Sequence, residues 1–309
     1  FSLPSNQKEK TEEKKLINYL LVIKSKIILK NIFHHLSKKK SLQIIQNNIK
    51  SQKRLDINLN DYKNYSQNYT PIEIEIIPVK NGYGNFINYL DNKLKKYYHI
   101  YFNNNKKKEI NKNRLEIYDD ISKITIVIDP KIISFFLLFQ YCSCIELINF
   151  TKFHRTNIYN MSYMFDYCVS LKEINFSNFH TDNVTDMSCM FKECNSLQKI
   201  NLSTFKTDNI IKINHMFFDC SSLEQLNISN FNTEKVKTME YMFFGCHSLK
   251  KLDISNFNTL NVNSMIGMFN QCKLLTDLNV TNFNINENCD ISYMLGECTN
   301  ELINKIKIG

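Results

Sequence analysis

The apolar and polar positions of the chain repeat with a period of 26 residues over its C-terminal half. Apolar side chains stand three, six and eight positions after a cysteine in each repeat, as Leu197, Ile200 and Leu202 do after Cys194. The cysteines that mark the period are Cys142, Cys168, Cys194, Cys220, Cys246, Cys272 and Cys298. One unit of this length cannot bury its apolar face alone, so a fixed period indicates units stacked on copies of themselves. The pattern predicts a solenoid over residues 131–309, with six full modules and a partial seventh.

Two spacings predict the local structure of each module. The apolar positions six and eight residues after the cysteine lie on one face of a short strand. Before the cysteine, Met161, Met164, Phe165 and Cys168 are spaced i, i+3, i+4 and i+7, which is typical of a helix. This segment follows a column in which five of six residues are good N-cap types: Asn160, Asp186, Lys212, Thr238, Ser264 and Asp290.

The predicted fold class is therefore α/β. We expect a leucine-rich-repeat-like parallel solenoid with one short strand and one short helical segment in each 26-residue module. A small, mainly helical N-terminal domain should precede it. A phenylalanine column eleven residues after the cysteines should be buried between the modules: Phe153, Phe179, Phe205, Phe231, Phe257 and Phe283.

The module F-x-T-x-x-V-x-x-M-x-x-M-F-x-x-C-x-S-L-x-x-L-x-(L/I/F) resembles the 26-residue repeat of BspA-type leucine-rich-repeat surface proteins. The resemblance covers residues 131–302. It implies a parallel solenoid used for adhesion or protein contact, with no catalysis in the repeat itself. Members of that family often carry a secretion signal or a lipoprotein anchor, whereas residues 1–13 show no charged region followed by an apolar one. A cell-surface location is expected only if the chain is a fragment that lacks its signal.

The residues before the solenoid divide into three predicted segments. Residues 1–11 are predicted to be disordered, and residues 12–70 carry apolar positions at helical spacing. Residues 71–130 should form a mixed connector and the N-terminal cap of the solenoid. The elements expected in this connector are strands at 72–76 and 124–128 and a helix over 86–101.

Within the helical segment, residues 27–55 resemble an F-box, because Ile28, Ile32 and Phe33 take the places of its first amphipathic helix. The leading Leu-Pro and the late Trp of that motif are missing. The resemblance implies docking of Ile32 and Phe33 to a Skp1-like adaptor, with the solenoid selecting the substrate of a ubiquitin ligase. The alternative is that these side chains close the core of the N-terminal domain.

Positive charge is confined to the N-terminal part of the chain. Residues 1–130 carry a net charge of +11 and residues 131–309 a net charge of −2, which gives +9 for the whole chain. Lysine runs such as Lys106–Lys108, with Tyr97 and Tyr98 nearby in the sequence, would suit a phosphate-rich partner. Because lysine and asparagine are abundant throughout, a solvated surface is the simpler interpretation, and nucleic-acid binding is not expected.

No pattern of catalytic or metal-binding residues stands out from the repeats, so no enzymatic activity, cofactor or metal is predicted. The cysteine ladder is interpreted as core packing, since a buried free cysteine behaves as a small hydrophobe; disulfides or a metal site are the alternatives. Ten cysteines without an evident pairing favour a reducing, cytoplasmic location. The longest apolar run, Ile132–Phe139, is too short to span a membrane. We expect a monomer.

The expected function is that of a non-enzymatic protein-interaction scaffold. Core columns keep their chemistry between modules, while the positions four and five residues after each cysteine change. These positions should face outward from the parallel sheet and contact the partner. They are Lys172, Glu173, Gln198, Lys199, Glu224, Gln225, Lys250, Lys251, Thr276 and Asp277.

Overall fold

The chain forms two compact units, residues 1–67 and 68–309, and the 26-residue repeats lie in the second. The computed structural model describes residues 68–176, 179–280 and 282–305, together with the isolated residues Ile23, Ile28 and Lys53. The predicted disordered segment 1–11, nearly all of the predicted helical segment 12–70, and the F-box-like residues Ile32 and Phe33 lie outside the described residues.

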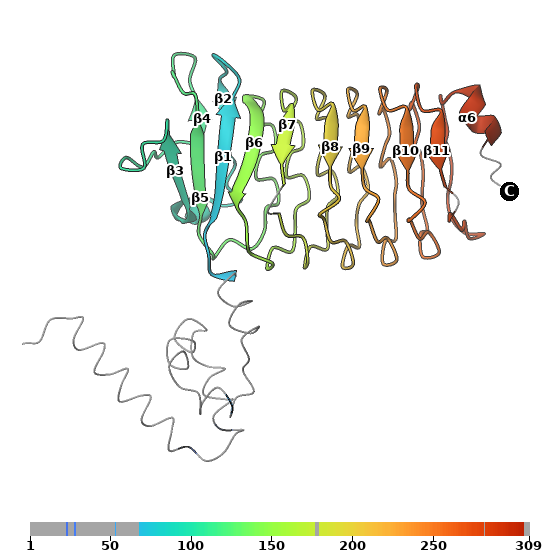
Figure 1. The fold of residues 1–309 in the computed structure, drawn as a ribbon, viewed down its shortest axis with the longest axis horizontal. Helices are drawn as coiled ribbons and strands as arrows, with labels where there is room; N and C mark the ends of the chain where they lie inside the picture. Colours follow the sequence, from blue (N-terminus) through green and yellow to red (C-terminus); the bar gives the residue numbers. More distant parts are fainter. Residues whose placement is uncertain are drawn as a thin grey trace, which may run out of the picture. The chain divides into compact units, whose positions relative to one another are not determined.

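A mixed sheet forms the beginning of the second unit, antiparallel except for the parallel pair β6 and β7 (Figure 1). The central strand β1 pairs antiparallel with β5 on one side and with β6 on the other, giving the order β3-β5-β1-β6-β7. The strands are β1 (Ile72–Pro78), β3 (Tyr98–Phe102), β5 (Ile124–Ile128), β6 (Ile145–Lys152) and β7 (Glu173–Asn175). Ile72, Ile74 and Ile76 of β1 are buried, and Glu73 and Glu75 between them are half-buried. The strands predicted from alternation at 72–76 and 124–128 are confirmed.

The helix predicted over 86–101 is wrong. A 3-10 helix, η1 (Asn92–Tyr97), occupies the middle of that range and β3 follows it directly. The Asp91 carboxylate accepts a hydrogen bond from the Lys93 N–H at 2.8 Å and so caps η1. Tyr98 and Ile100 then pair with β5, and these strand hydrogen bonds outweigh the helical spacing of the sequence. A two-stranded ribbon also forms, from β2 (Gly84–Asn85) and β4 (Arg114–Leu115).

Beyond the cap, the 26-residue repeats lie side by side in parallel register (Figure 1). Strand pairs join residues one period apart, as Ile200 and Leu226 do. The remaining strands are β8 (Lys199–Asn201), β9 (Gln225–Asn227), β10 (Lys251–Asp253) and β11 (Asp277–Asn279), and α6 (Asn300–Lys305) follows them. A second line of parallel bridges runs from Ser134 through Asn160 to Asp290, again in steps of one period. Each coil therefore contacts the next along two lines.

Turns stand where the sequence predicts a short helix in each module. Met164, for example, donates its N–H to the Met161 carbonyl at 3.3 Å, a three-residue turn, whereas Tyr163 donates to Ser188 in the next coil at 2.9 Å. Tyr163 and Tyr167 have positive φ values of 56° and 57°, which a continued α-helix excludes. The N–H groups of the turns thus alternate between bonds within the coil and bonds that join it to the next coil.

The column predicted to cap the helices caps these turns. Asn160 and Asp186 accept hydrogen bonds from the N–H two residues further on, at 2.8 and 2.9 Å. The chemistry expected of an N-cap residue is therefore present, but it serves a turn. The paired methionine and phenylalanine side chains of these turns are buried, for example Met164 and Phe165.

Two ladders of identical residues fill the interior. One is a stack of phenylalanine rings whose centroids lie 5.5 to 5.7 Å apart with interplanar angles of 2° to 10°. Its members are Phe139, Phe165, Phe191, Phe217, Phe243 and Phe269. The column predicted from Phe153 to Phe283 is buried up to Phe257, and Phe283 is half-buried.

The second ladder is that of the cysteines. Each thiol from Cys168 to Cys298 donates to a phenylalanine carbonyl of the preceding coil, over 2.9 to 3.3 Å. Cys220, for example, donates to the carbonyl of Phe191 at 2.9 Å. All ten cysteines of the chain are free thiols in the structure. Burial raises the pKa of the ladder thiols, so they stay protonated and can act as donors.

Candidate interaction surface

The predicted contact residues lie together on the outer side of strands β7 to β11. Nine of the ten side chains are exposed and Thr276 is half-buried. Inward-pointing residues between them, such as Ile200 and Leu252, are buried. Alternation accounts for the second residue of each pair, which begins a strand and is exposed where the next residue turns inward, whereas the first residue of each pair precedes the strand.

An open groove of about 1020 Å³ runs across β7, β8, β9 and β10. Six of the predicted contact residues line it: Glu173, Lys199, Glu224, Gln225, Lys250 and Lys251. Lys172, Gln198, Thr276 and Asp277 do not line the groove. Its apolar lining includes the half-buried Ile174 and Leu226. The groove thus combines charged, amide and aliphatic groups on one open surface.

Asparagines along the strands stiffen the groove. Asn201 accepts a hydrogen bond from the Ser203 N–H at 3.0 Å, and Asn227 accepts from the N–H and the hydroxyl of Ser229 at 3.3 and 2.9 Å. Such bonds fix the turn that ends each strand. A partner would therefore meet a surface whose backbone is already in place, which lowers the entropic cost of binding.

Ion pairs engage only part of the charge on this surface. Lys172 contacts Glu146 at 2.8 Å, and Lys251 contacts Asp277 at 3.4 Å. Both pairs lie at the solvent-exposed surface, where an ion pair contributes little stability. Among the described residues, no ion pair joins another side chain to any of the remaining charged groups of the groove, which are Glu173, Lys199, Glu224 and Lys250. These charges are available to a partner.

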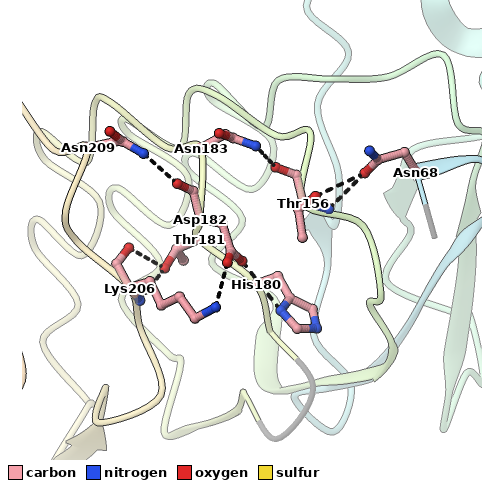
Figure 2. A network of polar contacts seen from close by, with 8 residues as sticks. All are labelled: Asn68, Thr156, His180, Thr181, Asp182, Asn183, Lys206 and Asn209. Carbon is pink, nitrogen blue, oxygen red and sulfur yellow. Dashed lines mark hydrogen bonds and ion pairs between the residues drawn. The ribbon is translucent and has the colours of Figure 1, made fainter. Parts of the chain in front are cut away.

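A polar network follows another edge of the coils (Figure 2). Asn68 accepts from the N–H and the hydroxyl of Thr156 at 3.0 and 3.2 Å. The Asn183 amide donates to the Thr156 carbonyl, and the Asn209 amide donates to the Asp182 carbonyl, each at 2.8 Å. Asparagine thus repeats the same bond in successive coils. This edge holds the stack together.

In the same network the Lys206 ammonium contacts the Asp182 carboxylate at 2.6 Å, and His180 lies 3.5 Å from the other oxygen (Figure 2). Burial raises the pKa of Asp182, but the hydrogen bond and charge of Lys206 outweigh it and hold that pKa below its usual value. Thr181 exchanges two hydrogen bonds with the backbone of Lys206, at 2.7 and 2.8 Å. Lys206 and Thr181 therefore find hydrogen-bond partners within the fold, whereas the Asp182 oxygen nearer His180 accepts no hydrogen bond from the described residues.

The two tyrosines considered for stacking beside the basic residues of the cap lie in different surroundings. Tyr98 is buried in β3, and Tyr97 lies between the ammonium groups of Lys96 and Lys131, 5.1 and 5.0 Å from its ring centre. Lys106 contacts Glu73 at 3.0 Å. Across the described ranges, no three His, Cys, Asp or Glu side chains come together in an arrangement that could hold a metal ion. None of the helices in this part of the chain is long and apolar enough to cross a bilayer.

Two overlapping segments of the chain, residues 134–227 and 201–306, match the family described as "Mycoplasma protein of unknown function, DUF285". Together they cover more than half of the chain. The chain belongs to the DUF285 family. No curated protein and no solved structure matches it. The DUF285 region includes every predicted contact residue of the strand face and leaves β1, β3 and β5 outside.

The sequence analysis missed Arg155, which closes the DUF285 stack at its first coil. In later coils the same position holds the buried threonines Thr181, Thr207, Thr233 and Thr259. The Arg155 guanidinium is fully buried and donates to the carbonyls of Asp129, Pro130 and Ile132 in the cap. Burial lowers its pKa to about 10, although the charge of Asp129 raises it. The departure from threonine at this position was the only signal in the sequence.

Proposed function

We propose that this protein is a non-enzymatic scaffold that binds a macromolecular partner, a protein, through the strand face of a leucine-rich-repeat-like solenoid. The DUF285 family is related to BspA-like surface repeat proteins, which supports the BspA-type resemblance of the module. The α/β solenoid of one strand and one covering segment per module is part of the same proposal, with turns in place of the helix.

The observation that carries the proposal is the groove over β7 to β10. Five residues after the cysteine its lining changes from coil to coil, from Glu173 to Lys199 to Gln225 to Lys251, while the columns that follow toward the core stay apolar. A rigid frame that presents different side chains at fixed intervals can select one partner by charge and shape. Repeat proteins use extended surfaces of this kind for binding.

The second candidate is adhesion at the cell surface, which the relation of DUF285 to surface repeat proteins favours. The ten free thiols, in contrast, favour a cytoplasmic location, since an oxidising compartment would pair them. The ligase-adaptor hypothesis depends on Ile32 and Phe33, outside the described residues. Recovery of a stoichiometric complex with a Skp1-like adaptor from the full chain would support it, and repeated failure with folded protein would count against it.

Co-purification tests the scaffold proposal. The tagged full chain should retain one or a few proteins from an extract of its source cells, and the double variant Lys199→Glu/Lys250→Glu should lose them. The matched control Lys237→Glu/Lys273→Glu makes the same change of net charge at exposed positions outside the groove and should retain them. Equal retention by both variants would exclude the groove as the contact surface.

A further inference from the structure

A row of aromatic side chains crosses the turn segments of the first five coils, away from the strands. We call this the turn face and define it by the outward residues between one and six positions before each ladder cysteine. Its aromatic members are Phe136, Tyr141, Tyr163, Tyr167, His215, Phe218, Tyr241 and Phe244. Tyr141 is exposed and the others are half-buried.

Contacts between neighbouring coils make this row nearly continuous. Tyr141 and Tyr167 lie 5.0 Å apart between ring centres, and Phe218 stacks on Phe244 at 4.6 Å. His215 lies 5.2 Å from Tyr241. Rings held by one another in this way lose little side-chain entropy when a partner docks. Aromatic residues of this type are also enriched at protein interfaces, where lysine and glutamate are depleted.

The gap in the row, at the third coil, is filled by a cation of the chain itself. The Lys192 ammonium lies 5.2 Å from the ring centre of Tyr167 and 5.4 Å from that of Phe218. A cation placed over an aromatic face is attracted by the ring quadrupole. The turn face therefore already holds one ammonium group between two rings of different coils.

Carboxylates surround these rings. Glu193, Asp219 and Glu240 lie on the turn face of the third to fifth coils, with the Asp166 carboxylate behind it in the second coil. Lys192 is the one lysine or arginine among the described residues of the turn face in the second to fifth coils. His215 adds little positive charge at neutral pH, because burial and the nearby Lys192 lower its pKa. Asp166 is buried, and one of its carboxylate oxygens has no hydrogen-bond partner. The face is thus both aromatic and acidic.

We propose that the turn face is a second interaction surface, which binds a lysine- and arginine-rich segment of a partner polypeptide. Its cationic groups would lie over the exposed ring faces and beside Glu193 and Asp219, as Lys192 lies over Tyr167 and Phe218. This surface is separate from the strand-face groove, and the inference does not rest on the proposed function.

Fluorescence anisotropy with defined probes tests the inference. The probes are labelled peptides of alternating lysine and serine, of arginine and serine, and of glutamate and serine, added to the full chain at physiological ionic strength. The two basic peptides should bind and the acidic peptide should not. The double variant Glu193→Gln/Asp219→Asn should weaken binding of the basic peptides at least about tenfold. Glu173→Gln/Glu224→Gln removes as many carboxylates from the strand face and should change affinity less than about twofold.

Lys192→Met is expected to increase affinity, a result that partial unfolding of the variant would not produce. Removing the chain's own ammonium frees the rings of Tyr167 and Phe218 and should tighten binding of the basic peptides about two- to fivefold, the worth of an exposed cation–π contact. Weaker or unchanged binding by this variant overturns the proposal. Equal losses for the two carboxylate variants, or binding of the acidic peptide, would likewise overturn it.

Discussion

Cysteine recurs at one position in seven coils because its side chain meets two demands of that position. The space is closed around the six cysteines from Cys142 to Cys272, and from Cys168 onward a phenylalanine carbonyl of the preceding coil lies within reach of a donor. A serine at this position would donate a hydrogen bond but would place a strongly polar hydroxyl in the core. An alanine would be apolar but would have no donor. A thiol is small, apolar and a weak donor, so it suits both. The interpretation of the ladder as packing follows from the sequence, but the thiol–carbonyl bond is seen only in the folded structure, because it joins residues of two coils.

Cys220→Ala tests this account. The variant loses packing volume and leaves the Phe191 carbonyl without the thiol donor, so the free energy of unfolding should fall by about 1 to 3 kcal/mol. Urea unfolding measures it. Cys289→Ala, at a half-buried cysteine outside the ladder, should cost less than about 0.5 kcal/mol. Equal costs would show that the ladder bond contributes nothing.

The thiols should also be free and slow to react. Denatured protein prepared without reductant should titrate ten thiols, and native protein at mildly alkaline pH should react first at Cys289 and last at the fully buried ladder. Burial raises the pKa of the ladder thiols and keeps the reactive thiolate scarce. A reproducible loss of four or more thiols from denatured protein would instead indicate disulfides.

Asp166 and Asp182 should respond to acid in opposite directions. Burial raises the pKa of Asp166, in spite of the hydrogen bond from Gln140, so its ionised form destabilises the fold at neutral pH. That cost is relieved as the pH falls through the raised value towards the unfolded value of about 3.9. The lowered pKa of Asp182 contributes stability above about pH 3.9, which is lost as the pH falls through the folded value.

Urea unfolding of two variants between neutral pH and about pH 3 checks these signs. The free energy of unfolding of Asp166→Asn should exceed that of the parent by the largest margin at pH 7, and this margin should shrink as the pH falls. Asp182→Asn should be less stable than the parent at pH 7, and that deficit should shrink at low pH. Differences that do not change with pH would contradict both assignments.

At the scale of elements, the sequence predicts which residues are buried better than it predicts the backbone that buries them. The spacing of Met161, Met164, Phe165 and Cys168 places four side chains inward for a helix and for consecutive turns alike. Only the positive φ values at Tyr163 and Tyr167, and hydrogen bonds to the next coil, decide between the two. Such inter-coil bonds join residues about one period apart, so the residue pattern within one turn segment does not predict them. The strands β1 and β5 were predictable because alternation along the chain indicates a strand and does not fit a helix.

Phe231→Ala tests the packing between coils. Phe231 is buried and lies parallel to Phe257, with ring centres 6.5 Å apart, so its removal should cost about 3 to 5 kcal/mol. The change in thermal unfolding gives the result. Tyr293→Ala, at a largely exposed ring, should leave the melting temperature nearly unchanged. A Phe231→Ala variant as stable as the parent would place this column outside the core.

The cap depends on Arg155, which joins the first coil to the segment before it. Arg155→Thr introduces the threonine found in later coils but leaves three cap carbonyls, one of them in a buried bond, without their donor, so we expect a loss of about 2 to 4 kcal/mol. Arg114→Thr removes an exposed guanidinium paired with Glu116 and should cost less than about 1 kcal/mol. Similar stabilities of the two variants would show that the cap is held by its strands alone.

At the scale of the second unit, one period produces two different outer surfaces. The strand face carries lysine, glutamate and amide side chains over a groove, and the turn face carries aromatic rings and carboxylates. The exposed positions of the strand face were predictable because they change between modules while the core columns keep their chemistry. The groove, and the way Lys192 joins rings of two coils, were not, because both arise from side chains about one period or more apart.

Site-specific photo-cross-linking tests most directly whether the strand face binds the partner. A photoreactive residue in place of Gln225, in the middle of the groove, should capture the same protein that co-purifies with the parent chain. The same residue in place of Lys237, which is exposed and outside the groove, should not capture it. Capture of that protein from position 237 and not from position 225 would contradict the strand-face account.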